Sequence, residues 1–158
     1  MKSKARAVVI GGGVVGVSTL YHLAAKGWDD SILLERKSLT SGSTWHAAGL
    51  LPLFNMSYSV GQIHKYSVRF YQELQDETGM DVGFRKVSNI RLASTQDRMD
   101  EYLQYKGVAD TIGVEVNVLS PQEIKDCWPL VSTENLIGAI QHPEDGYIQP
   151  ADLTQAFV

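Results

Sequence analysis

Three glycines near the amino terminus have a spacing that can bind a phosphate group. Gly11, Gly13 and Gly16 fit the pattern G-x-G-x-x-G, which forms a turn between a strand and a helix. Gly11 permits the tight turn, and Gly13 lacks the Cβ atom that would keep a pyrophosphate away from the backbone. Amide N–H groups and the positive end of the helix dipole would face the phosphate charge. We therefore expect a dinucleotide to bind at Gly11, Gly12, Gly13, Val14, Val15 and Gly16.

An acidic residue follows this turn at the distance where dinucleotide-binding domains hold a ribose. Glu35 stands 19 residues after Gly16, at the end of the next expected strand. Its carboxylate is placed to accept hydrogen bonds from both hydroxyl groups of an adenosine ribose. A carboxylate here argues against NADP, because it would repel the 2′-phosphate, but it does not separate NAD from FAD. The alternative is an ordinary strand–turn–helix with an exposed glutamate.

A long loop of small residues comes next, where a nicotinamide-binding domain would normally continue with a helix and a strand. Periodicity is absent from residues 36–57, and serine, threonine, alanine and glycine dominate. Loops of this length inside a compact domain are usually functional or disordered, and the embedded Trp45, Leu50 and Phe54 argue against disorder. Small side chains let the backbone approach a large planar ligand, so the loop favours a flavin over a nicotinamide.

The elements that must position the turn are a strand over 5–10, a helix over 14–26 and a strand over 31–35. The strands are short apolar runs bounded by glycine, as in buried parallel strands. Val14, Val17, Leu20 and Leu23 have helical spacing, and Gly27 follows as a helix terminator. The fold class expected is therefore α/β, with a Rossmann-like βαβ unit.

Further elements are expected after the loop. We predict a helix over 58–78, with Ile63, Tyr66, Phe70 and Leu74 on one packed face. We also predict strands over 84–93, 114–119 and 135–141, and a helix that Ser94 caps and Gly113 ends. Ser120-Pro121-Gln122-Glu123 predicts a helix start with a capping box. Asp145-Gly146 predicts a turn, and Pro150 begins a helix expected to continue to Val158.

Residues 8–50 resemble the amino terminus of the D-amino-acid-oxidase-type flavoproteins, most of all the dimethylglycine and sarcosine dehydrogenase branch. The resemblance implies FAD, with Glu35 and Arg36 at its adenosine end. It further implies that the histidine of Ser-Thr-Trp-His-Ala-Ala-Gly, here His46, carries the flavin covalently through its 8α-methyl carbon. The alternative is a loop histidine that makes no such bond. The residues that would wrap the phosphates and the ring are Gly42, Ser43, Thr44, Trp45, His46, Ala47, Ala48, Gly49 and Leu50.

The same resemblance implies a domain organisation. It assigns residues 1–57 to an FAD-binding βαβ unit with its flavin loop, and 58–149 to the start of an α+β substrate domain. Residues 150–158 begin a helix that returns to the FAD domain, because Gly146 to Pro150 resembles the family's Gly-Tyr-x-x-Pro entry to that helix. We expect the chain to be incomplete, since two parallel strands make a poor open sheet. Other segments or subunits would complete the fold.

The reaction implied is the oxidation of a secondary or tertiary amine, such as an N-methylated amino acid, with hydride passing to the flavin. Oxygen or a carrier protein would then accept the electrons, and we expect no catalytic proton-transfer residue within this segment. Two alternatives remain open. One is an NAD-binding oxidoreductase, against which the Trp45-His46 loop speaks, and the other is a truncated, non-catalytic fragment.

Bulk properties exclude some function classes. The 158 residues carry a formal charge of −4, which provides no basic surface for nucleic acid. No stretch approaches the roughly 20 apolar residues of a membrane span. A single cysteine, Cys127, rules out an internal disulfide and fits a reducing, cytoplasmic location. Beside Trp128, Cys127 is expected to be buried. His22, His64 and His142 lack metal-like spacing, so we expect surface or core roles and no metal.

Overall fold

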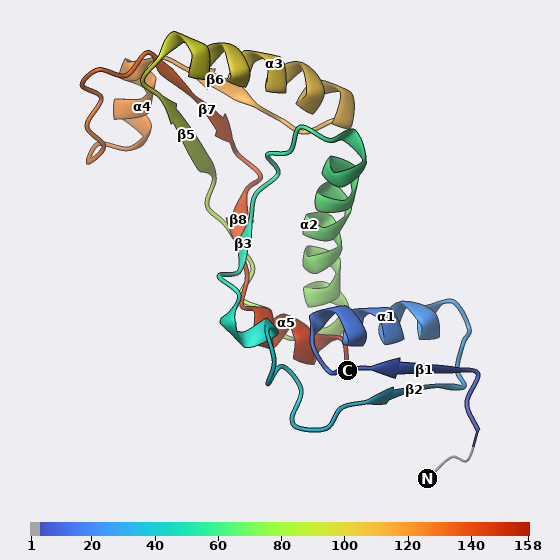
Figure 1. Cartoon of the computed structure of the whole chain (residues 1–158). Coiled ribbons are helices and arrows are strands. Elements are labelled where there is room, and N and C mark those ends of the chain that lie inside the picture. Colours follow the sequence, from blue (N-terminus) through green and yellow to red (C-terminus); the bar gives the residue numbers. More distant parts are fainter. Residues whose placement is uncertain (1–3) are drawn as a thin grey trace. The chain divides into compact units, whose positions relative to one another are not determined.

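The computed structural model describes residues 4–158, which fold as two compact units (Figure 1). Unit 1 contains the described residues up to Leu50 together with Phe70–Phe84 and Ile148–Val158. Unit 2 contains Leu51–Arg69 and Arg85–Tyr147. The chain therefore leaves unit 1 directly after the predicted flavin loop and returns to it twice.

Unit 1 begins with the predicted βαβ arrangement, β1 (Ala7–Ile10), α1 (Val14–Ala25) and β2 (Ser31–Leu34). The two strands pair in parallel along their full length. Gly27, predicted to end the helix, has φ of 76°, a left-handed conformation that glycine adopts without steric cost. The sequence-based α/β prediction is thus confirmed for this part of the chain.

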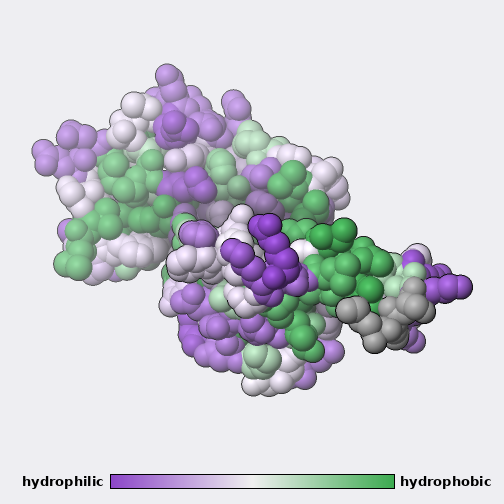
Figure 2. Space-filling view, turned by 60° about the horizontal axis from the view of Figure 1, so that its bottom comes forward, coloured by the Kyte–Doolittle hydropathy of each residue, from purple (hydrophilic) through white to green (hydrophobic). Residues whose placement is uncertain are grey.

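One face of the two-stranded sheet is apolar and exposed. α1 packs on the sheet, and alternation along β1 places Val8 and Ile10 on one side, where they are 50% and 83% exposed. Leu34, which pairs with Ile10, is 52% exposed. Figure 2 shows extended hydrophobic surface on this side of the molecule. Parallel sheets are normally covered on both faces, and these residues have the apolar character that such covering requires.

Unit 1 also contains η1 (Thr44–His46), the carboxyl-terminal part of α2 (Tyr58–Thr78) and α5 (Pro150–Ala156). Aromatic rings join these helices to α1. The rings of Phe70 and Phe157 stack with centroids 5.8 Å apart, and Tyr21 of α1 meets both rings edge-on. Tyr21 also donates a hydrogen bond of 2.9 Å to Glu77. These contacts hold α1 against the rest of unit 1.

Unit 2 is built on an antiparallel sheet with strand order β5-β7-β6. Its strands are β5 (Asn89–Ala93), β6 (Asn117–Leu119) and β7 (Gly138–His142), with α3 (Gln96–Ile112) and α4 (Pro121–Cys127) packed on it. A second small sheet has the order β3-β8-β4, with strands Leu50–Leu51, Gly146–Tyr147 and Arg85–Lys86. Leu119, Ile124 and Ala139 form a buried core beneath Trp128.

The predicted helix ends in unit 2 are largely confirmed. Gly113 ends α3 in the left-handed conformation, with φ of 77°. Ser120 and Glu123 form the expected reciprocal capping box at the start of α4. The N-cap of α3 was placed one residue early, because the Thr95 hydroxyl, and not that of Ser94, accepts the hydrogen bond from the Arg98 N–H.

Several sequence-based predictions were wrong in detail. The strand expected over 84–93 is divided into β4 and β5, and the strand expected over 114–119 is only three residues long. α5 ends at Ala156 and does not continue to Val158. On α2 the predicted packed face is buried at Leu74, but Ile63 and Tyr66 are more than half exposed.

Cys127 was expected to be buried, and it is exposed. It is the last residue of α4, a helix that turns its single buried residue, Ile124, toward the sheet and leaves its carboxyl-terminal end in solvent. Within residues 4–158, no helix is both long enough and apolar enough to cross a membrane. In the same range, no group of three histidine, cysteine, aspartate or glutamate side chains is arranged to hold a metal ion.

Candidate functional site

The glycine turn connects the carboxyl end of β1 to the start of α1, beside the carboxyl end of β2. Gly11 has φ of 110°, and its N–H donates to the Leu34 carbonyl at 2.9 Å, which ties the turn to β2. The N–H of Gly12 donates to Oε2 of Glu35 at 2.6 Å. Gly12 also accepts a hydrogen bond from the Thr40 N–H at 2.9 Å, so the following loop is fastened to the turn. The turn is therefore held from three directions.

The amino terminus of α1 retains amide groups that can bind an anion. Its N-cap, Gly13, is extended and has no side chain to cap the helix. The Val14 N–H donates to Oγ1 of Thr44 at 3.0 Å, whereas the first-turn N–H groups of Val15 and Gly16 have no intrahelical acceptor. A Cβ atom on Gly13 would lie only 2.9 Å from Thr44 Oγ1. Glycine at this position thus lets the buried threonine bring the flavin loop against the turn.

Glu35 closes the site from the end of β2. Its Oε1 accepts from the Lys37 N–H at 2.8 Å, and its Oε2 accepts from Gly12. Hydrogen bonds from these two backbone groups lower the pKa of Glu35 below its ordinary value of 4.5, with a smaller contribution from Arg36. The carboxylate is therefore negatively charged at neutral pH, and each oxygen keeps a second lone pair for a ligand hydroxyl.

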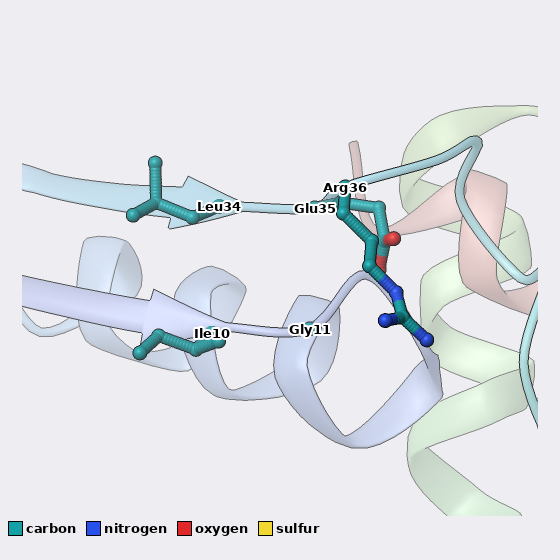
Figure 3. A pocket seen from close by; sticks show the side chains of 5 residues that line it. All are labelled: Ile10, Gly11, Leu34, Glu35 and Arg36. Carbon is teal, nitrogen blue, oxygen red and sulfur yellow. The ribbon is translucent and has the colours of Figure 1, made fainter.

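A pocket of about 350 Å³ lies where the two strands end. Ile10 and Leu34 form its apolar wall, and Gly11, Glu35 and Arg36 line the rest. In Figure 3 the Glu35 carboxylate reaches from the end of β2 toward the turn, with the Arg36 guanidinium beside it. Open α/β sheets bind their ligands at the carboxyl ends of strands, and this pocket lies there. Its mixed lining suits a ligand with both an apolar ring and hydroxyl groups.

The second half of the flavin loop is more exposed. Trp45 is 62% exposed, and its ring packs against that of His46 with centroids 4.3 Å apart. His46 Nδ1 lies 3.1 Å from the Gly42 carbonyl oxygen. A carbonyl can only accept, so Nδ1 is the donor in this contact and Nε2 is not engaged by it. Ala47, Ala48 and Leu50 are exposed as well.

Gly49 fixes the end of the loop within unit 1. Its φ is 73°, and its carbonyl accepts a hydrogen bond of 2.8 Å from the Ile148 N–H. A Cβ atom at this position would lie 2.1 Å from the Ile148 carbonyl oxygen, so no larger residue fits. The structure therefore brings Gly11 to Gly16, Glu35 and Thr44 together directly, while Trp45 and His46 lie on the exposed part of the loop.

Unit 2 contains a buried polar cluster that the sequence did not reveal. His142 and Asp145 are 0% and 2% exposed, and Nε2 of His142 lies 3.1 Å from the hydroxyl of buried Tyr105. The Arg91 guanidinium lies 4.1 Å from the centre of the Phe54 ring. The local pattern indicated a turn at Asp145 and a surface or core role for His142. It could not connect them to Arg91 and Tyr105, which lie 37 or more positions earlier in the sequence.

Burial changes the titration of this cluster. It raises the pKa of Asp145 from 3.8 to about 6 and lowers the pKa of His142 from 6.5 to about 4. The contribution of Asp145 to stability is complete below pH 3.8 and is lost as pH rises through 6. The contribution of His142 is complete above pH 6.5 and is lost as pH falls through 4. Between pH 4 and 6 the two effects oppose each other.

We therefore expect the free energy of unfolding to change little between pH 4 and 6. Asp145→Asn removes the contribution that falls with pH, so the stability of the variant should rise across this window by at most about 1.4 kcal/mol per pH unit. Urea unfolding of both proteins at half-unit pH steps measures this difference. Parallel stability curves for the two proteins would show that Asp145 has an ordinary pKa.

Comparison with known proteins identifies the family. Residues 6–158 match the DAO family, described as FAD dependent oxidoreductases, and this match includes nearly the whole chain. The chain belongs to the DAO family of FAD-dependent oxidoreductases. The resemblance inferred from the glycine turn and the flavin loop is confirmed. FAD is the cofactor of this family, so the NAD alternative is not retained.

Two named proteins are similar to this chain over nearly its whole length. Mitochondrial dimethylglycine dehydrogenase of Rattus norvegicus is 41% identical over 155 residues, which are 98% of this chain and 18% of that protein. Mitochondrial pyruvate dehydrogenase phosphatase regulatory subunit of Mus musculus is 34% identical over 156 residues, 99% of this chain and 18% of that protein. The chain thus spans less than a fifth of these relatives.

A solved structure confirms the fold of this DAO-family chain. The crystal structure of L-proline dehydrogenase from P. horikoshii superposes with a TM-score of 0.91 and 26% sequence identity. The match covers 99% of this chain and 41% of that protein. The fold of this chain is therefore also found in a solved dehydrogenase structure.

Proposed function

We propose that the protein containing this chain oxidises a secondary or tertiary amine, such as an N-methylated amino acid, and passes hydride to FAD. The similarity to dimethylglycine dehydrogenase supports this substrate class. The observation that carries FAD binding is the junction of three parts: the open amino terminus of α1, the ionised Glu35 and the loop fastened by Thr44. Those parts match the diphosphate, the ribose and the ring of the cofactor, in that order.

The residues present fit FAD. The N–H groups of Val15 and Gly16, at the positive end of the α1 dipole, would bind the diphosphate. Glu35 would accept hydrogen bonds from the ribose hydroxyls, and Arg36 would lie beside the adenosine. Gly13 has no side chain to stand between the diphosphate and the backbone. Even a Cβ atom there would crowd Thr44 Oγ1. The remaining residues of the loop, Gly42 to Leu50, would follow the phosphates and the isoalloxazine ring.

His46 is the proposed covalent anchor of the flavin. Its Nδ1–H donates to the Gly42 carbonyl, which orients the ring and leaves Nε2 as the nucleophilic nitrogen. The side chain is exposed and is therefore accessible to a cofactor. Contact with the Trp45 ring restricts its rotamers. Bound FAD would supply the redox chemistry, and this chain would bind and orient it.

The electron acceptor, oxygen or a carrier protein, and the cytoplasmic location remain predictions.

A second candidate function is retention of FAD without turnover of an amine. The 34% identity to a phosphatase regulatory subunit favours this alternative, since that name describes regulation and not oxidation. Anaerobic addition of dimethylglycine or sarcosine to the flavin-loaded protein separates the two. Bleaching of the visible flavin absorption supports the enzyme, and unchanged absorption supports the regulatory alternative.

The covalent bond is tested on a denaturing gel viewed under ultraviolet light. Protein produced in a flavin-replete host should give a fluorescent band that survives denaturation. His46→Ala should lose this fluorescence completely, although it retains FAD reversibly through the turn. Cys127→Ser is the matched control, because Cys127 is the one thiol of the sequence and is exposed. Fluorescence that persists in His46→Ala and vanishes in Cys127→Ser would place the anchor at the cysteine.

A further inference from the structure

Leu53 is held through both of its backbone polar groups. Its N–H donates to Oδ1 of Asp145 at 2.8 Å, and its carbonyl accepts from the Tyr105 hydroxyl at 3.2 Å. The side chain of Leu53 is only 4% exposed. All three residues belong to unit 2, and Leu53 stands three positions after Leu50, the last residue of the predicted flavin loop. The chain is thus gripped immediately after it leaves the loop.

Asp145 and Tyr105, which hold Leu53, belong to a buried polar cluster that is costly to bury. Arg91 Nε, His142 Nδ1 and Asp145 Oδ2 are buried and have no hydrogen-bond partner among residues 4–158. Burial also raises the pKa of Tyr105 to about 12, with a further increase from the nearby Asp145. Apolar side chains of the same volume could fill this core without such unsatisfied atoms. Because burying these polar groups does not increase stability, the cluster is better explained by a positional role.

The segment that ends at Leu53 is also fixed where it begins, at Gly49. Gly49 accepts a hydrogen bond from the Ile148 N–H, within unit 1, and Leu53 donates to Asp145, within unit 2. Between these bonds β3 and β8 are neighbours in one sheet.

Asp145 also shapes its own strand connection. Its backbone carbonyl accepts from the N–H groups of Val87 and Ser88, at 3.1 and 2.9 Å. Ser88 has φ of 65°, which interrupts the strand between β4 and β5. The aspartate is consequently fixed by its backbone before its side chain reaches Leu53. A side chain held in this way is rigid enough to define the position of another segment.

We propose that Asp145 and Tyr105 are positioning residues for the flavin loop, which they hold at its exit through Leu53. The proposal rests on the proposed function, in which Gly42 to Leu50 contact the flavin. Thr44 fastens the loop to the α1 turn, Gly49 fastens it to Ile148, and Leu53 completes the series. Loss of the last attachment would let residues 50–55 exchange among conformations and would weaken cofactor binding.

The test combines amide hydrogen exchange with FAD affinity in the full-length protein. A His46→Ala background makes FAD binding reversible, so a dissociation constant can be measured. Tyr105→Phe removes the hydroxyl that donates to Leu53 and contacts His142. It should raise both the exchange rate of residues 50–55 and the dissociation constant at least about fivefold, since each lost hydrogen bond is worth about 1 kcal/mol. Asp145→Leu should have at least this effect. Asp145→Asn should stay near the parent protein, because its amide oxygen still accepts from Leu53.

Tyr102→Phe is the matched control. Tyr102 lies on the same helix, is 8% exposed, and its hydroxyl donates to the Leu92 carbonyl at 3.5 Å. Its ring meets that of Phe54 edge-on, and phenylalanine keeps this ring contact. Tyr102→Phe should leave exchange in 50–55 and FAD affinity within twofold of the parent. Equal effects of Tyr102→Phe and Tyr105→Phe, or faster exchange in Tyr105→Phe with unchanged FAD affinity, would overturn the proposal. A parent protein that refuses FAD would refute the proposed function, and the positioning role with it.

Discussion

Gly16→Ala is expected to unfold the glycine turn and to leave the protein without flavin. A Cβ atom at this position would lie 2.0 Å from the Gly11 carbonyl oxygen and 3.1 Å from its carbonyl carbon. Both are backbone atoms of the turn, and the Gly11 N–H is bonded to β2, so neither can move without breaking that bond. We expect a loss of about 3–5 kcal/mol in the free energy of unfolding, the range of severe core changes. Urea unfolding and flavin content after purification measure the two effects.

Gly107→Ala is the control for the same chemical change. Gly107 lies inside α3, and a Cβ atom there would meet nothing within 4 Å. Alanine is favoured over glycine inside a helix by up to about 1 kcal/mol, so this variant should be slightly stabilised and fully flavinylated. If Gly16→Ala had the same stability and flavin content as Gly107→Ala, the inference that α1 lies too close to the Gly11 carbonyl for a Cβ atom would be wrong.

Glu35→Ala is expected to raise the dissociation constant for FAD by at least about tenfold, because a hydrogen-bonded charge is lost at the site. The carboxylate accepts from the N–H groups of Gly12 and Lys37, so it orders the turn as well as offering oxygens to the ribose. Glu35→Gln keeps one acceptor oxygen and should have an intermediate effect. Titration of the apoprotein with FAD, in the His46→Ala background, measures all three proteins.

The dependence of FAD affinity on pH provides an independent check of the role of Glu35. Because the pKa of Glu35 is lowered in the folded protein, its stabilisation is present above the ordinary value of 4.5 and is lost as pH falls through the folded value. In the His46→Ala background, FAD affinity should fall over the same range when Glu35 is present and stay flat in Glu35→Gln. Glu101→Ala serves as the control, since Glu101 forms an exposed ion pair with Arg98 on α3. An equal loss of affinity in Glu101→Ala would contradict a specific role for Glu35.

The first part of the fold could be predicted because its rules are local. Strand, glycine turn, helix and acidic residue follow each other within 30 residues, and each obeys a short-range steric or electrostatic requirement. The same is true of Gly113 and of the Ser120–Glu123 capping box, where the bonded groups are neighbours in the chain. The resemblance carried by the small-residue loop then identified the family and FAD from sequence alone.

The contacts that shape the rest of the site join residues far apart in sequence. Thr44 reaches Val14 across 30 residues, and Asp145 reaches Leu53 across 92. Neither pair has a periodicity or spacing that a sequence pattern can detect. For the same reason the interruption between β4 and β5 was missed: it depends on the Asp145 carbonyl, which lies nearly 60 positions later in the sequence than the two N–H groups it accepts from.

Exposure was the other quantity that only the tertiary structure decided. Helical spacing grouped Ile63 and Tyr66 with buried Leu74, yet α2 passes from unit 2 into unit 1 and does not present one continuous face to a single core. Cys127 and Trp128 are adjacent in sequence, but the helix ends between them and exposes the cysteine. Local pattern determines which element forms, whereas burial depends on which distant segments pack against it.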